Sequence, residues 1–193
     1  MIKNPYDFFL KPIDHWLLQE HRKWLTSWAT GKTLEIGIGT GLNLGYYPNN
    51  VQLTGIDHNQ QQLEHAQEKA DTLKMNVDLL EMNAQQLPFE DESFDTVIMT
   101  FVLCGVDSVE QTIGEALRIL KPQGRFLMAN HVLSTHQPFQ FIQHQLDRLT
   151  VDRYHEHWTR TPIEYLKTKT NILHIKRNRF GILESVYAQK NPN

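Results

Sequence analysis

Short apolar runs alternate with amphipathic segments along most of this chain, which is the pattern of strands alternating with helices. Five runs have the length of buried strands: Thr33 to Gly37, Val51 to Asp57, Val77 to Met82, Phe94 to Thr100 and Arg125 to Ala129. The fourth run is apolar on both faces, which is typical of a strand at the centre of a parallel sheet covered by helices on each side.

Apolar residues at helical spacing predict helices between and around these strands. Asp14 and Ser108 stand where a side chain can cap the first turn of a helix, and the helix after Ser108 turns Ile113, Leu117 and Leu120 toward the core. The turn Pro122-Gln-Gly124 then leads into the fifth strand. The predicted helices cover residues 14–29, a short segment before Pro48, 59–73, the segment after Ser108, 134–150 and 162–170.

This order of elements amounts to five βα units and predicts an α/β fold. We expect a doubly wound, Rossmann-like, mostly parallel sheet with right-handed crossovers, in three α/β/α layers. The tail from Ile172 to Gln189 reads as a hairpin that turns near Phe180-Gly181 and adds antiparallel strands to the edge of the sheet. A length of 193 residues fits a single domain, 1–193, with residues 1–30 as an N-terminal helical cap.

Composition excludes some classes of function. The net charge of -3 gives no general attraction to polyanions, so nucleic acid is not an expected partner. Cys104 is the only cysteine, and the longest apolar stretch, Val97 to Val106, is far too short to span a bilayer. No signal-peptide pattern opens the chain. We therefore expect a soluble cytoplasmic protein, with peripheral membrane contact left open and the oligomeric state undetermined.

The turn after the first strand carries three glycines at alternate positions, Gly37, Gly39 and Gly41, preceded by Glu35. Glycines let a backbone approach a ligand closely and adopt dihedral angles that other residues avoid. Dinucleotide sites favour G-x-G-x-x-G instead, so the spacing argues against a nicotinamide-dependent oxidoreductase. Glu35 would repel a pyrophosphate, but it could order the cationic amino group of an amino-acid moiety.

Polar residues follow the next strands at the same edge of the predicted sheet. Asp57, followed by His58, ends the second strand at the distance from the glycines where a carboxylate can accept both ribose hydroxyls of an adenosine. Asn83 and the Ala84 amide would lie near the adenine edge. Phe101, after the fourth strand, could either wall the pocket or belong to the core.

Together these motifs resemble the class I methyltransferases that use S-adenosylmethionine (SAM), in the group that includes ubiquinone/menaquinone methyltransferases. The resemblance rests on Leu-Glu-Ile-Gly-x-Gly-Thr-Gly, Asp57, Asn-Ala-Gln-Gln-Leu-Pro-Phe, Ser-Phe-Asp and Leu-Lys-Pro-x-Gly, in the family's order across 33–130. One departure is Asn83, where many relatives carry Asp, although its carbonyl can still accept a hydrogen bond. Two branches look similar: the thiol methyltransferase-like branch, and the bacterial phospholipid N-methyltransferases, which Asn130-His131 resembles.

The resemblance implies SAM as cofactor and a small-molecule or lipid-like methyl acceptor: a thiol, an amine or a quinol precursor. Because methyl transfer is an in-line displacement, the protein mainly has to position the reactants. His131 follows the fifth strand and is the candidate acceptor-side catalytic group, with a purely structural role as the alternative. Residues 134–170 would form acceptor-site helices. The alternative function is a non-catalytic SAM-binding sensor or partner-binding module.

Two further groups of residues, a pair of histidines and the N-terminal aromatic residues, do not define a binding site. His155 and His157 flank a glutamate but lack companion ligands at metal spacing, so no metal is assigned. The N-terminal aromatic residues could form a lid over the cofactor, a membrane-touching surface or ordinary packing. They are Tyr6, Phe8, Phe9, Trp16, Trp24 and Trp28.

Overall fold

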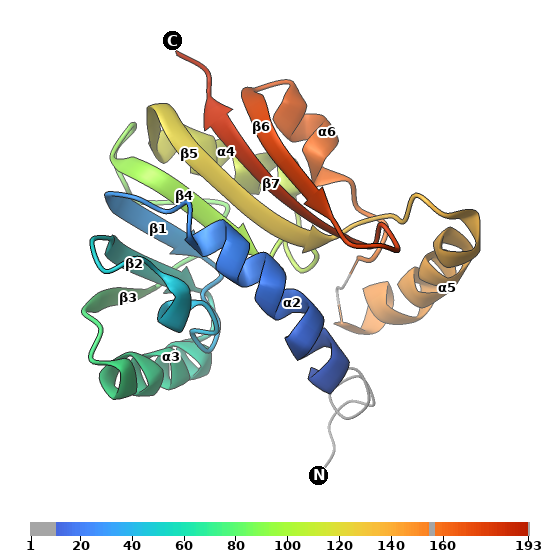
Figure 1. Cartoon of the computed structure of the whole chain (residues 1–193), viewed down its shortest axis with the longest axis horizontal. Helices are drawn as coiled ribbons and strands as arrows, with labels where there is room; N and C mark the ends of the chain where they lie inside the picture. The colour runs from blue at the N-terminus through green and yellow to red at the C-terminus, as the bar shows by residue number, and fades with distance from the viewer. Residues whose placement is uncertain (1–10, 155–156, 193) are drawn as a thin grey trace.

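A computed structural model of the chain describes residues 11–154 and 157–192. Its centre is one seven-stranded sheet in the order β3-β2-β1-β4-β5-β7-β6 (Figure 1). The strands are β1 (Lys32–Ile36), β2 (Gln52–Asp57), β3 (Val77–Glu81), β4 (Phe94–Thr100), β5 (Leu120–His131), β6 (Thr170–Arg177) and β7 (Leu183–Lys190). The helices are α2 (Lys11–Thr26), η1 (Leu44–Tyr46), α3 (Gln60–Leu73), α4 (Val109–Ile119), α5 (Gln137–Tyr154) and α6 (Pro162–Lys167).

The sheet confirms the predicted doubly wound architecture. Strands β1 to β5 pair in parallel, and β7 runs antiparallel to both β5 and β6, which is the predicted C-terminal hairpin at the sheet edge. After β3 the chain returns to the middle of the sheet, so that β1 and β4 are neighbours. In open α/β sheets, ligands bind at such a switch point, in the crevice beyond the carboxyl ends of the strands.

Helices cover both faces of the sheet and bury one apolar cluster on each. On one face, Met99 and Phe126 from the central strands pack with Ile113 of α4 and Leu166 of α6. On the other face, strand residues such as Ile98 and Leu127 pack with side chains from α2 and α3, Leu25 and Leu63 among them. The three-layer prediction is thereby confirmed.

The short helix predicted before Pro48 is present as the 3-10 turn η1, but the count of five βα units is wrong after β3. Residues 82–93 join β3 to β4 without a helix. Backbone groups of that connection bond to α4 instead: Arg118 donates to the carbonyls of Leu87 and Phe89, and Glu115 accepts from the Leu87 N–H. Side chains of α4 thus replace the internal hydrogen bonds that a helix would have supplied.

Two boundaries also differ from the prediction. Helix α2 already runs from Lys11, so position 14 lies inside the helix and not at its first residue. Strand β5 begins at Leu120, which the apolar spacing places in the preceding helix, and the predicted turn at Pro122 to Gly124 is an irregularity within the strand. There the register passes from Phe94↔Leu120 to Thr96↔Arg125, and Gln123 takes a positive φ of 60°. Between these pairs β5 has more residues than β4, and the unpaired ones form a bulge-like kink.

Two of the N-terminal aromatic residues, Trp24 of α2 and Trp28, serve packing, and the side chain of Trp16 lies outside the described part of the structure. Trp28, just after the helix, stacks on His174 of β6 and contacts Tyr187 of β7, and Trp24 meets Trp28 edge to face. Tyr6, Phe8 and Phe9 lie outside the described residues. Within 11–154 and 157–192, we find no helix with the length and apolar character needed to cross a membrane.

Candidate functional site

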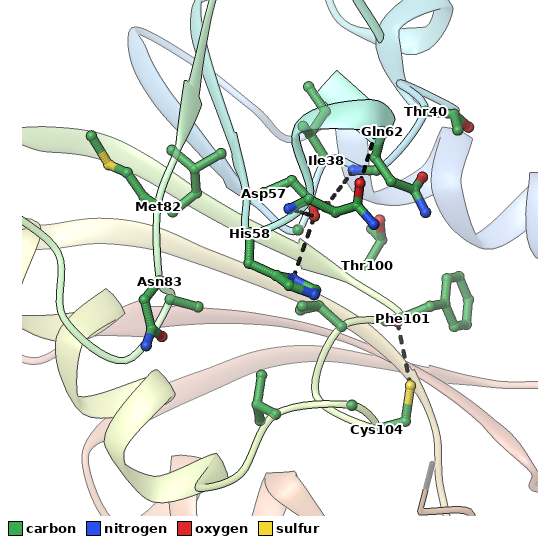
Figure 2. A pocket seen from close by; sticks show the side chains of 18 of the residues that line it. Ile38, Thr40, Asp57, His58, Gln62, Met82, Asn83, Thr100, Phe101 and Cys104 are labelled. Atoms are coloured by element: carbon green, nitrogen blue, oxygen red, sulfur yellow. Dashed lines mark hydrogen bonds and ion pairs between the residues drawn. The ribbon is translucent and has the colours of Figure 1, made fainter. Parts of the chain in front are cut away.

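An open cavity of about 840 Å³ lies at the carboxyl ends of β1, β2 and β4. Figure 2 shows Asp57 between Asn83 on one side and Phe101 on the other. Of the residues predicted from the sequence, those that line the cavity are Gly37, Gly39, Asp57, His58, Asn83, Ala84 and Phe101. Glu35, Gly41 and His131 are not in the lining. The topology therefore gathers side chains that are far apart in the sequence around one space.

The glycine turn approaches the cavity because each of its glycines has a positive φ. Gly37, Gly39 and Gly41 have φ of 71°, 54° and 72°, which residues with a Cβ rarely adopt. A Cβ on Gly39 would meet nothing closer than 3.5 Å, so this position faces open space. A Cβ on Gly41 would lie 2.6 Å from Leu44 Cδ1. Gly39 thus belongs to the wall of the cavity, and Gly41 to the packing beneath it.

Asp57 joins the end of β2 to this turn. Its Oδ2 accepts from the Gly39 N–H at 2.9 Å, and its Oδ1 accepts from the Asn59 N–H at 3.0 Å. His58, with an exposed side chain, places Nδ1 3.4 Å from Asp57 Oδ1. A carboxylate offers about four lone-pair sites, so two backbone bonds leave capacity for hydroxyl donors from a ligand.

Asn83 follows β3, and its Oδ1 accepts from the Gln85 N–H at 2.9 Å. This local turn uses one lone pair of the Asn83 side-chain carbonyl. The second lone pair remains for a hydrogen bond from a ligand. Apolar residues of the lining, Met82, Val102 and Val106, pack against the same apolar cluster as the neighbouring Ala84. A flat, mostly apolar group with a polar edge fits between these side chains.

Phe101 follows β4 in an unusual backbone conformation. Its φ is 59°, and its N–H donates to the Ala129 carbonyl at 2.7 Å, which holds this strained residue in place. Its ring centroid lies 5.3 Å from that of His131, which in turn lies 4.9 Å from the ring of Trp158. His131, the last residue of β5, therefore stands beside the cavity-lining Phe101 without lining the cavity itself.

Glu35 is buried, with 1% of its surface exposed. Its Oε1 accepts from Asn43 Nδ2 at 2.6 Å and its Oε2 from the Tyr47 hydroxyl at 2.8 Å. Burial raises the pKa of Glu35 to about 7, against the lowering effects of the Tyr47 hydrogen bond and the nearby Arg22. The expectation that Glu35 meets a ligand directly does not match this placement, because the carboxyl group is buried and outside the cavity lining.

Arg22 of α2 lines the cavity, and sequence reasoning did not single it out. One guanidinium nitrogen donates to Asn43 Oδ1 at 3.0 Å and to Thr100 Oγ1 at 3.1 Å, and the group lies 4.9 Å from the centre of the Phe101 ring. A single arginine in an amphipathic helix carries no sequence signal of a site. Its position depends on how α2 crosses the sheet.

Cys104 also belongs to the lining of the cavity. It is half-buried, and its Sγ donates to the Phe101 carbonyl at 3.4 Å. The site as a whole places a guanidinium near one end, a carboxylate and backbone N–H groups in the middle, and an apolar slot at the other end. Such a site can bind and orient a ligand that combines a carboxylate, a sugar and a flat ring.

Comparison with known proteins agrees with this geometry. Residues 34–128 match the methyltransferase domain family. The chain is 34% identical over 120 residues to a phosphatidylethanolamine N-methyltransferase of Cereibacter sphaeroides, an alignment that covers 61% of this chain and 59% of the relative. It is 37% identical over 81 residues to the ubiquinone/menaquinone biosynthesis C-methyltransferase UbiE of Rickettsia massiliae, covering 41% of this chain and 33% of the relative.

A solved structure of a SAM-dependent methyltransferase from Methanosarcina mazei superimposes with a TM-score of 0.70 at 23% identity, covering 87% of this chain and 96% of the other. That likeness supports the fold. Both curated relatives are matched over less than two thirds of their length. Residues 34–128 thus carry a methyltransferase domain, and the strand order and the glycine turn at its switch point agree with the class I, SAM-dependent form of that domain.

Proposed function

We propose that the chain transfers the methyl group of SAM to a lipid-like or small-molecule acceptor. The observation that carries the proposal is the cavity, which brings the glycine turn, Asp57, Asn83 and Arg22 together at the carboxyl edge of the sheet. In this proposal the methionine carboxylate pairs with Arg22, the ribose hydroxyls donate to Asp57, and the adenine lies in the apolar slot beside Asn83 and Ala84. A guanidinium pairs well with a carboxylate because it offers several fixed donors.

Glu35 is a positioning residue in this proposal. Its two oxygens hold Asn43 and Tyr47, and Asn43 in turn accepts from Arg22 and donates to Thr100. The chain of bonds runs from the buried carboxyl group to the guanidinium at the cavity. Loss of Glu35 would therefore act on the ligand through Arg22.

The acceptor class favoured by the phosphatidylethanolamine N-methyltransferase relative is the amine of a phospholipid headgroup. In the reaction, the lone pair of a neutral amine nitrogen attacks the methyl carbon while the carbon–sulfur bond breaks. Sulfur leaves as the neutral thioether of S-adenosylhomocysteine, and the new ammonium loses a proton to water or to a base. His131 is the proposed acceptor-side group for that proton, and residues 134–170 would shape the acceptor pocket.

Ligand binding can be tested at the single cysteine. Because Cys104 lines the cavity, S-adenosylhomocysteine should slow its alkylation by N-ethylmaleimide about a hundredfold when the ligand stands at a hundred times its Kd. NADH at the same concentration serves as the control and should leave the rate unchanged. Equal protection by the two ligands, or by neither, would refute the proposed SAM site.

The acceptor is tested by incubating the protein with methyl-labelled SAM and phosphatidylethanolamine, a long-chain thiol or a demethylated quinol. Label should appear in the phospholipid extract in preference to the others. Strong binding of SAM without transfer to any of the three would instead favour a SAM-binding sensor or partner-binding module. Label confined to the thiol or the quinol would reassign the acceptor and keep the cofactor site.

A further inference from the structure

Helix α5 exposes large apolar side chains that the body of the protein leaves uncovered. Phe141 is 67% exposed, Ile142 52% and Leu146 37%. Positions 141, 142, 145 and 146 follow the spacing of one helix face. Single exposed apolar residues are common on protein surfaces, but three on one face of a helix form a patch that calls for a partner.

The opposite face of α5 is fixed to the body by polar contacts, so the exposed face has a defined orientation. Gln143 is buried, donates to the Val132 carbonyl at 2.8 Å and accepts from the Ser134 N–H at 2.8 Å. One turn further along, Asp147 accepts from the Trp158 N–H at 2.5 Å. These contacts direct Phe141 and its neighbours outward.

The turn between β6 and β7 extends the apolar patch. Phe180, at this turn, is 45% exposed, and its ring lies 5.2 Å from that of Phe139 on α5. Figure 1 shows α5 beyond the ends of β5 and β7, beside this turn. We call the set Phe141, Ile142, Leu146 and Phe180 the α5 patch.

Two arginines border this patch, although the chain as a whole carries a net charge of -3. Arg177, at the end of β6, does not add to them, because it pairs with the buried Glu184. Arg179 adjoins Phe180 at the turn, and Arg148 lies on the exposed side of α5. Residues 132–146 contain no acidic side chain. Apolar residues interleave with these charges, so no basic run stands out in the sequence.

From this combination we infer that the α5 patch docks on the surface of a bilayer with anionic headgroups. Apolar side chains on an exposed helix can enter the headgroup boundary, and neighbouring arginines gain from the negative surface potential of the lipid. A second copy of this chain would bring arginines against arginines around the apolar face, whereas anionic headgroups neutralise these charges.

The docked surface lies close to the proposed active site. Ring contacts lead from the cavity-lining Phe101 to His131 and on to Trp158, whose backbone N–H bonds to Asp147 of α5. A bilayer under α5 would therefore stand at the carboxyl edge of the sheet, where a lipid acceptor has to enter. The inference deepens the proposed function, but it rests on the α5 patch and not on SAM binding.

Vesicle flotation of the full chain, without SAM, tests the docking. Binding should be strong to vesicles of phosphatidylcholine with phosphatidylglycerol and weak to phosphatidylcholine alone. The double variant Phe141→Ser with Ile142→Ser should bind the anionic vesicles roughly tenfold more weakly, because two exposed apolar side chains no longer leave water. The control Leu73→Ser, at a similarly exposed leucine on α3, should bind like the wild type.

Charge is tested with Arg148→Glu combined with Arg179→Glu, which should lower anionic-vesicle binding roughly tenfold and weaken its salt dependence. Lys69→Glu on α3 is the matched control and should leave binding unchanged. Calorimetry with S-adenosylhomocysteine in the same variants should give wild-type affinity, which separates failed docking from failed cofactor binding. Unchanged vesicle binding in both double variants would overturn the inference. A dimer seen by light scattering that the serine substitutions dissociate would also overturn it, because the patch would then bind a second copy of the chain.

Discussion

The carboxylate of Asp57 accepts a hydrogen bond from the backbone N–H of Gly39, with 2.9 Å between Oδ2 and the amide nitrogen. This bond ties the end of β2 to the turn after β1. The part of the site proposed for the sugar and the part proposed for the amino-acid end are therefore one unit. A change at Asp57 should act on the ligand directly and also on the shape of the glycine turn.

Asp57→Ala should weaken the binding of both S-adenosylhomocysteine and adenosine by about 1 to 3 kcal/mol, because a charged acceptor disappears from the site. Calorimetric titration of each ligand measures this loss. Asp78→Ala on the neighbouring strand β3 is the control, since that side chain is exposed and outside the cavity lining. Unchanged affinity for adenosine in Asp57→Ala would contradict the proposed placement of the sugar.

Arg22→Ala should weaken the binding of S-adenosylhomocysteine but not the binding of adenosine. Affinity for S-adenosylhomocysteine should fall by about 1.5 to 3 kcal/mol, the range for a hydrogen bond to a charged group, while affinity for adenosine stays the same. Adenosine lacks the carboxylate that Arg22 is proposed to bind. Lys23→Ala, at the exposed neighbouring residue, should change neither affinity. Equal losses for both ligands in Arg22→Ala would mean that the arginine supports the fold of the site and does not bind a carboxylate.

The contrast between these two residues shows what the sequence could predict. Gly37, Asp57, Asn83 and Phe101 each follow an apolar run, and parallel strands carry their ends to the same edge of the sheet whatever the loops do. Arg22 precedes the first strand. Its place at the cavity depends on how the α2 segment packs against the far side of the sheet, through contacts such as Trp28 with residues of β6 and β7.

Glu35 shows a second limit of sequence reasoning. The motif correctly placed this carboxyl group next to the glycine turn, but partners 8 and 12 residues later determine where it points. Asn43 and Tyr47 flank the short helix η1, whose position the apolar pattern does not determine. The irregular connection between β3 and β4 has the same kind of cause, because its hydrogen bonds from Arg118 form only after α4 has packed.

Glu35 should make the protein less stable as pH rises. Its pKa is about 7 in the folded protein and 4.5 ordinarily, so between these values the folded state binds more protons than the unfolded state. The free energy of unfolding should therefore decrease from about pH 4.5 to pH 7 through this group. In Glu35→Gln the contribution should vanish, and Tyr47 can accept from the new amide.

Urea unfolding of wild type and Glu35→Gln at several pH values measures the effect as the difference between the two curves. The comparison with Glu35→Gln is needed because His21 acts in the opposite direction in both proteins. Burial lowers the pKa of His21 to about 4, so this group increases the free energy of unfolding as pH rises from about 4 to 6.5. Glu68→Gln, at an exposed carboxyl on α3, should track the wild type. A constant gap between wild type and Glu35→Gln at all pH values would show that Glu35 does not titrate in this window.

His131→Ala should lower turnover more than cofactor affinity if the ring serves the acceptor. We expect kcat to fall about a hundredfold, the lower range for a proton-transfer group, with the Kd for S-adenosylhomocysteine nearly unchanged. Steady-state kinetics and calorimetry on the same preparation measure the two quantities. His65→Ala, at an exposed histidine on α3 outside the cavity lining, is the control. Parallel losses in kcat and in cofactor affinity would assign His131 a structural role through its contact with Phe101.

Gly39 and Gly41 should respond differently to alanine, although they share a motif. Each needs a positive φ, so each substitution costs about 1 to 2 kcal/mol of folding stability from backbone strain. In Gly41→Ala the new Cβ also collides with Leu44 Cδ1 and lies 3.3 Å from Ala66 Cα, which adds about 1 to 3 kcal/mol of overpacking.

Gly39→Ala meets open space in the protein, so its methyl group should collide with the bound ligand instead. Thermal unfolding without ligand should therefore rank the variants as wild type, Gly39→Ala, then Gly41→Ala, in order of falling stability. Calorimetry with S-adenosylhomocysteine, below the unfolding temperature of all three, should show a larger loss of affinity for Gly39→Ala than for Gly41→Ala. The reverse order of affinities would mean that the ligand does not lie against Gly39, and the amino-acid end of SAM would then need another place in the cavity.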